Sequence, residues 1–561
     1  MLRDFAWLTV LALVFIGSGI GWRDPWPPDE PRFVAIARDM VASGQWLFPH
    51  VGGELYQDKP PLYFWLLAAG FALTGSERIG FLLPSFAAAC GVLFLVHDLA
   101  RRIAGRGAAI TSAVLLGTTM QFVITMRGAQ IDPTLLLLTT LSLYGFLRHL
   151  LYGPAWGWYL LAGLAAGLGV IAKGVGFLPM LILLLYVLMR LRRWNELPSI
   201  GNGVARWALA PGACLLGISL WLVPMWLAVQ ANPLPELLAY RDEILLQQTV
   251  QRYAGAWQHE RPAYYFLTAV IPWTWLPVSA LVFWLAPRWS DAWRERRASV
   301  WLPLAWAILV VAFFSATPGK RSVYVLPALP AVILAAAPYL EALLQRRGVR
   351  AIGICLAAVL LCSLAIAWIG AATGSQVVQQ RLQDIGLTAI TPLGITVVAG
   401  GLALIASVRR DSRLAWPVTL GAVALMFSWL IVPVLNPVRS GEAFIHAVQR
   451  QLRPEQTLGL VAYQEQFLLY LDRPAVNFGH RRWREEKAES YDAAAWLNAG
   501  PNRVLLMKET TIAECFGAAE YRRFVGKASR HRWWLVGAPA RESCERRGKL
   551  ARAVVYAPPL H

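Results

Sequence analysis

The chain has 561 residues, of which 57% are hydrophobic and only 15% are charged, and its mean hydropathy is +0.48. A soluble protein of this length needs more charge than that to cover its surface, so the composition excludes a soluble globular protein. Apolar stretches of about 17–25 residues, the length that spans the hydrocarbon core of a bilayer, recur from Phe5 to Leu435. We therefore predict a polytopic α-helical membrane protein.

About thirteen segments have the length and composition of transmembrane helices. The first follows a single arginine and shows no convincing small-residue cleavage site, so we interpret it as a retained span rather than a signal peptide. The predicted spans cover residues 5–21, 79–99, 107–125, 131–150, 157–172, 174–191, 204–229, 263–286, 299–315, 322–343, 350–371, 388–407 and 415–435.

The arginine clusters between these spans determine the predicted orientation. With the N-terminus in the cytoplasm, every cluster falls in a cytoplasmic loop, as the positive-inside rule requires. The same distribution explains the net charge of +19, so we expect membrane lipids and no nucleic acid among the partners. The clusters are Arg101, Arg102 and Arg106; Arg190, Arg192 and Arg193; Arg288, Arg294, Arg296 and Arg297; Arg346, Arg347 and Arg350; and Arg409, Arg410 and Arg413.

One further apolar run, at residues 61–75, is left out of this count. If it crossed the membrane, all the later arginine clusters would move to the outer side. We therefore predict that it is a juxtamembrane or re-entrant segment within a periplasmic stretch at residues 22–78. The C-terminus then lies in the periplasm.

The composition changes near Ser440, where charges become dense and short apolar runs appear, such as residues 458–463 and 503–508. These runs suit strands that alternate with helical stretches. We predict a transmembrane domain over residues 1–438 and a periplasmic α/β domain over residues 439–561. Cys515 and Cys544 lie in the second domain, and an oxidising compartment favours a disulfide if their Cα atoms lie within about 7 Å.

The predicted outer loops hold charged residues that the positive-inside rule does not explain. Asp29 and Glu30 stand at the start of a short amphipathic helix, where helix capping is an equally good interpretation. Lys59 follows Tyr56 and Asp58 in the stretch YQDKPPL. The loop at residues 231–262 and the short loop near residue 320 add the basic and aromatic residues Arg252, His259, Lys320, Arg321 and Tyr324.

Asp132 stands at the outer mouth of a predicted span, where an unpaired carboxylate is costly. It either caps that helix, pairs with Arg127 or has a role in a site. Cationic side chains beside phenolic hydroxyls suit a phosphate group. The sequence contains no GxxxxGK[ST], HExxH or CxxC motif, so the economical ligand is a lipid phosphate whose alkyl chain enters the bilayer.

Several phrases recur in one family: PDE at 28–30, ASGQW at 42–46, KPPL at 59–62, AKGVGFLP at 172–179, QRY at 251–253 and FFSATPGKRSVYVLP at 313–327. In this order they resemble the bacterial members of the protein O-mannosyltransferase superfamily, in particular the aminoarabinose lipid A transferases. The resemblance implies a GT-C fold and an inverting glycosyltransferase of the bacterial inner membrane with a periplasmic active site. It implies transfer of aminoarabinose or a similar sugar from an undecaprenyl-monophosphate carrier to a periplasmic acceptor, foremost the phosphate of lipid A, by a monomer.

The resemblance also assigns roles to residues. Asp29 matches the essential acid of the first outer loop, and Asp132 matches a second acid of the catalytic cavity. Lys59 and Arg252 match the pair that binds the carrier phosphate, with hydroxyl groups from Tyr56 and Tyr324. Secondary candidates are Glu30, Asp58, His259, Lys320 and Arg321. No cofactor is implied with certainty; a divalent cation stays open, because Asp58 stands where the family has a longer acid.

Two alternatives remain. The same donor could serve a transferase that acts on protein Ser/Thr or on glycan hydroxyl groups. A lipid-linked sugar transporter or flippase belongs to another class, but transporters usually carry polar residues in mid-span and inverted repeats. In this sequence the polar residues concentrate at the outer mouths of the spans, which favours the enzyme.

Overall fold

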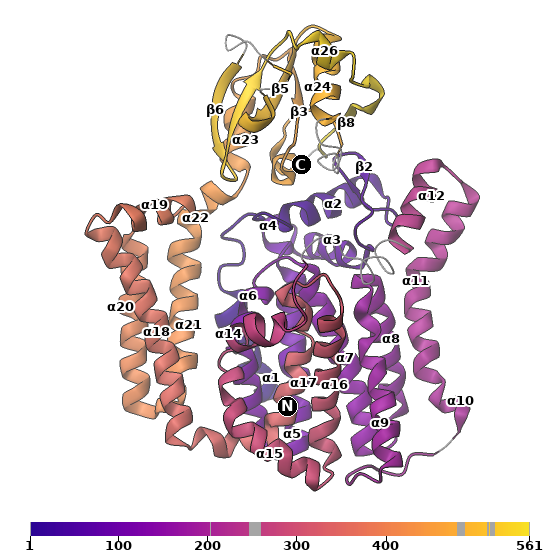
Figure 1. Cartoon of the computed structure of the whole chain (residues 1–561), viewed down its shortest axis with the longest axis vertical. Coiled ribbons are helices and arrows are strands. Elements are labelled where there is room, and N and C mark those ends of the chain that lie inside the picture. Colours follow the sequence, from indigo (N-terminus) through magenta and orange to yellow (C-terminus); the bar gives the residue numbers. More distant parts are fainter. Residues whose placement is uncertain are drawn as a thin grey trace.

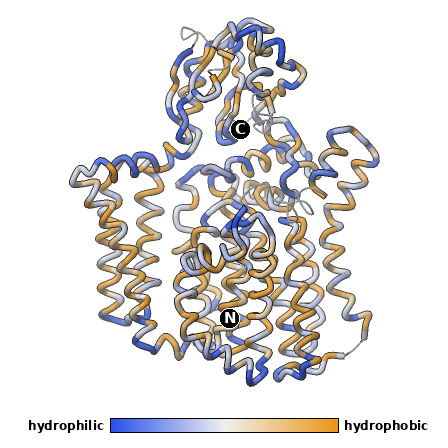
Figure 2. The backbone as a smooth tube through the Cα atoms, in the orientation of Figure 1, coloured by the Kyte–Doolittle hydropathy of each residue, from blue (hydrophilic) through white to orange (hydrophobic). Residues whose placement is uncertain are grey.

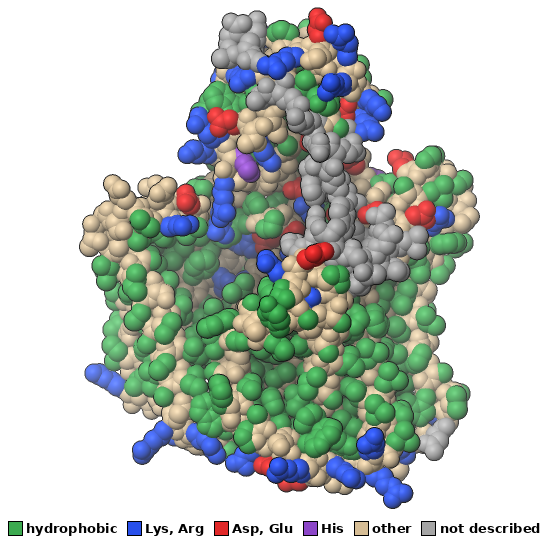
Figure 3. Space-filling model, viewed as in Figure 1, with side chains coloured by type: hydrophobic (Ala, Val, Ile, Leu, Met, Phe, Trp, Pro, Cys, Tyr) green, Lys and Arg blue, Asp and Glu red, His purple; other side chains and the backbone are tan. Residues whose placement is uncertain are grey.

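The computed structural model describes residues 2–201, 203–245, 260–479, 488–512, 515–516 and 522–559. Long helices form a bundle, a layer of short helices covers one end of it, and a sheet lies beyond that layer (Figure 1). We call this end, covered by α2 (Glu30–Ser43), α3 (Leu62–Thr74) and α4 (Glu77–Gly80), the capped end. The opposite end holds the arginine clusters and is called the basic end; Figure 3 shows Lys and Arg side chains gathered along it.

Hydrophobic residues run along the bundle, and hydrophilic ones collect at its two ends and in the C-terminal region (Figure 2). In the described part of the chain, seven helical stretches are long and apolar enough to cross a membrane, or eight with one bent pair. The chain is thus a multi-pass membrane protein, while the count of thirteen spans stays a prediction. The bundle helices are α1 (Leu2–Ala12), α5 (Leu83–Gly117), α6 (Met120–Met126), α7 (Ile131–Tyr152), α8 (Trp156–Lys173), α9 (Ile182–Leu191), α10 (Val204–Trp207), α11 (Leu209–Ala231), α12 (Pro235–Asp242), α14 (Ile271–Thr274), α15 (Val282–Arg294), α16 (Ala298–Ala316), α17 (Ala328–Leu344), α18 (Arg347–Ala372), α19 (Gln376–Asp384), α20 (Thr391–Asp411), α21 (Ala415–Met426) and α22 (Val432–Arg439).

Two predicted spans differ from the structure in shape. The segment predicted as one helix at residues 263–286 is bent by 105° between Thr274 and Ser279. Pro272 and Pro277 lie at this bend, and proline removes the backbone N–H that a continuous helix needs. Helix α5 joins two predicted spans, and its backbone leaves the helical conformation at Ala104 and at Gly105, whose φ is +86°.

The apolar run at residues 61–75 forms α3, which has 13 residues and is too short to cross a bilayer. It lies against α2 at the capped end rather than within the bundle (Figure 1). Phe33 of α2 packs on Tyr63 and Phe64 of α3 with ring centroids 5.6 and 5.7 Å apart. The prediction that this run stays on one side of the bundle agrees with the structure.

The C-terminal region contains a six-stranded sheet in the order β6-β7-β5-β3-β4-β8. Strand β3 pairs in parallel with β4 and β5, and the other pairs are antiparallel. The predicted runs at 458–463 and 503–508 correspond to β3 and β5, and the predicted disulfide between Cys515 and Cys544 is present. The elements are α23 (Glu442–Gln449), β3 (Thr457–Leu460), η9 (Glu465–Tyr470), β4 (Ala475–Asn477), α24 (Ala488–Asn498), β5 (Arg503–Lys508), α25 (Glu509–Ile512), β6 (Arg522–Ala528), β7 (His531–Val536), α26 (Glu542–Glu545) and β8 (Val554–Tyr556).

The sheet region shares one hydrophobic core with the capping helices. Phe33 and Ile36 of α2 belong to the same buried cluster as Leu460, Phe467 and Trp533 of the C-terminal region. Burial of apolar surface is the main favourable contribution to such packing. The C-terminal region is therefore anchored on the first loop of the chain, which carries several of the candidate site residues.

A small hairpin presents the Lys59 loop to this region. Strands β1 (His50–Val51) and β2 (Glu54–Leu55) are joined by Gly52 and Gly53, with φ of +62° and +88°. A two-residue turn with both φ values positive favours glycine, because it has no Cβ atom to clash. A Cβ at Gly52 would also lie 2.8 Å from the hydroxyl of Tyr463. The turn therefore fixes where the chain enters the segment of residues 56–60.

Candidate active site

Asp29 stands immediately before α2, but its side chain makes no capping hydrogen bond. The carboxylate instead lies 3.6 Å from Arg32 Nη1 and 3.7 Å from Arg321 Nη2. Its side chain is 21% exposed, which leaves it accessible at the capped end. The capping interpretation is therefore wrong for Asp29, and the acid faces cations from two separate elements.

Glu30 is buried, and its carboxylate accepts four hydrogen bonds. Arg23 donates from Nη1 at 2.5 Å and from Nη2 at 2.8 Å. The backbone N–H groups of Trp26 and Ala129 donate at 2.7 and 2.9 Å. Glu30 thus ties the first loop to the segment that precedes α7, and its lone pairs are engaged in holding that loop.

Asp132, in the first turn of α7, forms an ion pair with Lys173 at the end of α8. The alternative that Asp132 pairs with Arg127 is therefore wrong. Arg127 donates instead to Phe15 O at 2.9 Å and to the Ser428 hydroxyl at 2.6 Å. Lys173 was not among the partners predicted for Asp132.

The ammonium group of Lys173 also lies 5.2 Å from the ring centroid of Tyr324. Tyr324 lies in the short helical segment η6 (Ser322–Val325) and stacks on Phe314 at 5.2 Å. A cation over an aromatic face is attracted by the ring quadrupole. Asp132, Lys173 and Tyr324 therefore form one group, contributed by three different elements.

Two features connect Glu30 with Asp132. The Oε1 atom of Glu30 bonds to Ala129, three residues before Asp132. Burial raises the pKa of Tyr63 well above its usual value, and the carboxylates of Glu30 and Asp132 add to this shift. Both carboxylates thus act electrostatically on Tyr63 of α3.

The Lys59 loop joins β2 to α3. Tyr56 is buried, and its ring packs on Phe64 with centroids 5.9 Å apart. Asp58 and Lys59 are half-buried. Arg252, the second predicted cation at the carrier phosphate, and the secondary candidate His259 lie outside the described residues.

Lys320 and Arg321 have different surroundings although they are neighbours. Lys320 is buried and donates to the backbone carbonyls of Thr317 and Arg261, the latter at 2.9 Å. These bonds fasten the segment at Glu260 and Arg261 to the loop before η6, which indicates a structural role for Lys320. Arg321 extends toward Asp29 and contributes the charge from this loop.

Arg32 connects the C-terminal region to Asp29, and the sequence analysis did not assign it to the site. Its Nη2 atom lies 2.8 Å from Glu465 Oε1, and its Nη1 atom lies 3.6 Å from Asp29. Burial opposes the charge of Arg32, yet its pKa lies above the ordinary value because neighbouring groups favour the cation. Those groups include Glu465, Tyr56 and Asp29.

Among the side chains that the structure describes, no group of three or more His, Cys, Asp or Glu residues could hold a metal ion. The divalent cation that the sequence leaves open stays open, because residues 246–259 are outside the described part of the chain.

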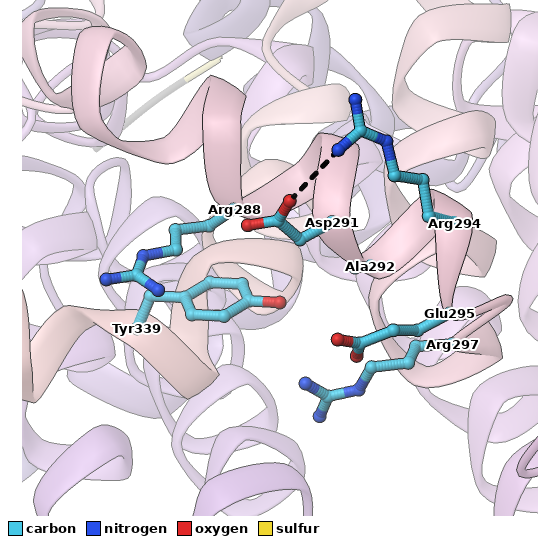
Figure 4. A pocket seen from close by; sticks show the side chains of 7 residues that line it. All are labelled: Arg288, Asp291, Ala292, Arg294, Glu295, Arg297 and Tyr339. Atoms are coloured by element: carbon cyan, nitrogen blue, oxygen red, sulfur yellow. Dashed lines mark ion pairs between the residues drawn. The ribbon is translucent and has the colours of Figure 1, made fainter.

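A surface pocket lies far from this group, at the basic end. It is formed by α15, the turn before α16, and α17, and Figure 4 shows its arginine and acidic side chains around Tyr339. Asp291 and Arg294 form an ion pair of 3.8 Å there, and both side chains are more than half exposed. None of the predicted site residues lines it. The lining residues are Arg288, Asp291, Ala292, Arg294, Glu295, Arg297 and Tyr339.

The fold is that of the GT-C membrane glycosyltransferases. ArnT from Cupriavidus metallidurans bound to undecaprenyl phosphate superposes with a TM-score of 0.73 and 21% identity, covering 96% of this chain and 99% of that one. The apo structure of the same protein gives a TM-score of 0.72 and 20% identity. Residues 58–226 match the family described as dolichyl-phosphate-mannose-protein mannosyltransferase. Residues 58–226 are thus similar to this family and the fold is similar to that of ArnT, so the predicted resemblance is confirmed.

Sequence relatives point the same way. The undecaprenyl phosphate-alpha-4-amino-4-deoxy-L-arabinose arabinosyl transferase of Pseudomonas aeruginosa is 33% identical over 337 residues, which are 57% of this chain and 57% of that protein. The protein of the same name from Pseudomonas savastanoi pv. phaseolicola is 30% identical over 353 residues, 62% of this chain and 63% of its own length. The similar region therefore spans less than two thirds of these relatives.

Proposed function

We propose that this protein is an inner-membrane glycosyltransferase that moves aminoarabinose or a similar sugar from an undecaprenyl-monophosphate carrier to a phosphate of lipid A. The names of the relatives support the donor and the sugar. The undecaprenyl phosphate bound to the ArnT of the same fold supports the lipid carrier. The arginines at the basic end favour a cytoplasmic location for that end, so the capped end and the C-terminal region would face the periplasm.

The observation that carries the proposal is the convergence of acids and cations at the capped end. Asp29 lies between Arg32 and Arg321, and Asp132 pairs with Lys173 beside Tyr324. The leaving group of the proposed reaction is an anion, which nearby cations would stabilise. The reaction also requires an acidic side chain near the sugar. We assign Asp29 and Asp132 to the sugar and acceptor side of the reaction.

In the proposed reaction the bond between the anomeric carbon and the carrier phosphate breaks while an acceptor oxygen attacks the same carbon. Lys59, Arg252 and the hydroxyl groups of Tyr56 and Tyr324 would stabilise the charge that develops on the leaving phosphate. A single displacement inverts the anomeric configuration. Retention would require two carboxylates about 5–5.5 Å apart, one of them acting as nucleophile.

The role of Asp29 depends on the acceptor. A hydroxyl acceptor must lose a proton, and Asp29 would then act as the general base. A phosphate acceptor is already ionised, so Asp29 would orient it or stabilise positive charge on the sugar ring. Asp29→Asn should therefore abolish transfer to a hydroxyl acceptor and reduce transfer to a phosphate acceptor less severely.

The test is a transfer assay with purified protein and radiolabelled polyprenyl-phosphate sugars. The products are sorted into lipid A, glycan and protein, and label in glycan or protein would replace the proposed acceptor. A flippase would be supported instead if lipid A, glycan and protein all stayed unlabelled while the donor moved across proteoliposome membranes.

Lys59→Ala tests whether Lys59 binds the carrier phosphate. Loss of a charge-assisted contact is worth about 1.5–3 kcal/mol, or roughly a tenfold to hundredfold loss of rate. Lys59→Arg should recover little activity, because a planar guanidinium does not replace a compact ammonium. Lys527→Ala, at an exposed lysine of β6, is the control. If Lys59→Ala keeps wild-type turnover and donor affinity, Lys59 only extends toward lipid headgroups.

A further inference from the structure

Two arginines flank Trp26 at the capped end, and a third, Arg530, acts electrostatically on one of them. Arg439 is the last residue of α22, and Arg530 stands in the turn between β6 and β7 with a φ of +68°. Both are exposed, whereas Arg23 is buried. The guanidinium carbons of Arg23 and Arg439 each lie 4.9 Å from the centroid of the Trp26 ring. Residues distant in sequence thus present cations around one indole ring.

The charges of this group are only partly balanced. Arg23 is paired with Glu30, but neither Arg439 nor Arg530 forms an ion pair with any residue that the structure describes. Partial burial lowers the pKa of Arg439, and the nearby cations Arg530 and Arg23 lower it further. The charged groups acting on Arg439 are thus both cations. A bound anion would relieve this repulsion.

Asp24, another carboxylate of this loop, is engaged elsewhere. Asp24 accepts from Asn436 Nδ2 at 2.7 Å and pairs with Arg78 at 2.8 Å. The Oδ1 atom of Asn436 in turn accepts from the Trp26 indole N–H at 2.9 Å. Asn436 lies one turn before Arg439 on α22. This network fixes Trp26 relative to the end of α22, so the cation group is a built feature rather than a set of independent surface residues.

The group lies close to the depth of lipid headgroups. Trp22 and Trp429 are each 49% exposed, and their rings lie 5.2 Å apart. Exposed tryptophans of this kind are typical of the membrane–water interface. Figure 3 shows a hollow in this face, below the C-terminal region and beside the helices α18, α20 and α21, with Lys and Arg side chains at its rim. A ligand held here could keep its acyl chains in the bilayer.

We propose that Arg439, which packs on Trp26, and Arg530 bind a phosphate group of the acceptor lipid, at a site separate from Lys59, Tyr56 and Tyr324. Guanidinium groups suit a phosphate monoester, because each can donate two parallel hydrogen bonds. The site is connected to the proposed chemistry through Arg23 and Glu30, which immediately follows Asp29. This inference rests on the proposed function and adds the residues that would hold the phosphate of the acceptor lipid.

Binding to the full-length protein in mixed micelles tests the site without turnover. The probes are phosphatidic acid, phosphatidylcholine and inorganic phosphate. Arg439→Gln with Arg530→Gln should weaken binding of phosphatidic acid by about tenfold or more, equivalent to about 1.4 kcal/mol or more. Arg450→Gln, at an exposed arginine of the same region, is the control and should leave binding unchanged.

Three results would overturn the site. The double variant could bind phosphatidic acid as tightly as the wild type. Arg450→Gln could weaken binding equally, which would indicate a general effect of surface charge. Inorganic phosphate could compete as well as the lipid does, which would indicate a site for a free ion. An unchanged melting temperature of the double variant shows that any loss is not due to unfolding.

The transfer assay separates this inference from the proposed function. The double variant should raise KM for a phosphorylated acceptor lipid at least tenfold while KM for the donor stays at the wild-type value. An inactive wild type with intact binding of phosphatidic acid would refute the proposed function alone. Active transfer with unchanged KM in the double variant would refute the acceptor site alone.

Discussion

Replacing Glu30 by glutamine should unfold the first loop rather than remove a catalytic group. The Oε2 atom accepts from Arg23 and from Trp26 N, and Oε1 accepts from Arg23 and Ala129 N. Glutamine retains one acceptor oxygen and presents an amide N–H₂ where the other oxygen was. Two of the four hydrogen bonds are then lost, and the buried charge of Arg23 loses its partner.

The expected loss is large because the pair is buried. Removing one partner of a buried ion pair costs about 3–5 kcal/mol, and the retained oxygen places Glu30→Gln near the lower value. In domains of 150–250 residues, 1 kcal/mol shifts Tm by roughly 2–4 °C, and by less in a longer chain, so we expect a fall of about 5 °C. Thermal unfolding of the detergent-solubilised protein measures it.

Asp291→Asn is the control, because an exposed ion pair contributes at most about 1 kcal/mol. A Glu30→Gln protein with wild-type Tm and no transfer activity would refute the structural role. Glu30 would then have to be counted among the residues that take part in the chemistry.

Three other predictions concern the capped end and the C-terminal region. Burial raises the pKa of Asp39 to about 7, although Tyr556 donates a hydrogen bond to it at 3.2 Å. Because the folded state then holds a proton that the unfolded state releases, stability falls as pH rises from about 4 to about 7. Asp39→Asn should raise Tm at pH 8 but not at pH 4, and an equal shift at both would contradict this. Cys515→Ser opens a disulfide with a sequence separation of 29 and should lower the free energy of unfolding by roughly 3–4 kcal/mol; Cys90→Ser, at a free cysteine, controls for the substitution. A reporter fused after Gly75 should report the periplasm, and a cytoplasmic signal would reverse the proposed orientation.

The parts of the structure that the sequence predicts well depend on local composition. Helix boundaries follow the apolar runs, so α7 and α18 begin and end within a few residues of the predicted spans. The position of α3 outside the bundle follows from the arginine clusters, because one extra crossing would invert all of them. Strands β3 and β5 follow from short apolar runs between turn residues.

The pairings at the site are less accessible from sequence, because they join residues far apart in the chain. Asp132 and Lys173 are 41 residues apart, and Arg32 and Glu465 are 433 apart. Either cation could have met any of several carboxylates, and only the packing of the helices selects the partner. Asp29 and Glu30 are neighbours and were both candidate site residues. Glu30 is nevertheless buried and accepts four hydrogen bonds, whereas Asp29 remains accessible.

The C-terminal region matters to the candidate site although it offered no motif. Glu465 bonds Arg32, the carbonyl of Leu469 accepts from Arg38 at 2.8 Å, and Asn477 donates to Gly52 O at 2.7 Å.

Each of these contacts reaches the loop of residues 22–78, which carries Asp29 and Lys59, and none reaches the long bundle helices. The bundle holds the same loop from the other side, through Glu30 and Ala129. A loop held from two sides keeps its charged groups in a fixed arrangement, and electrostatic stabilisation of a leaving phosphate depends on such preorganisation. The region therefore contributes by packing and by polar contacts between residues far apart in the chain, and this explains why its importance is visible only in the folded chain.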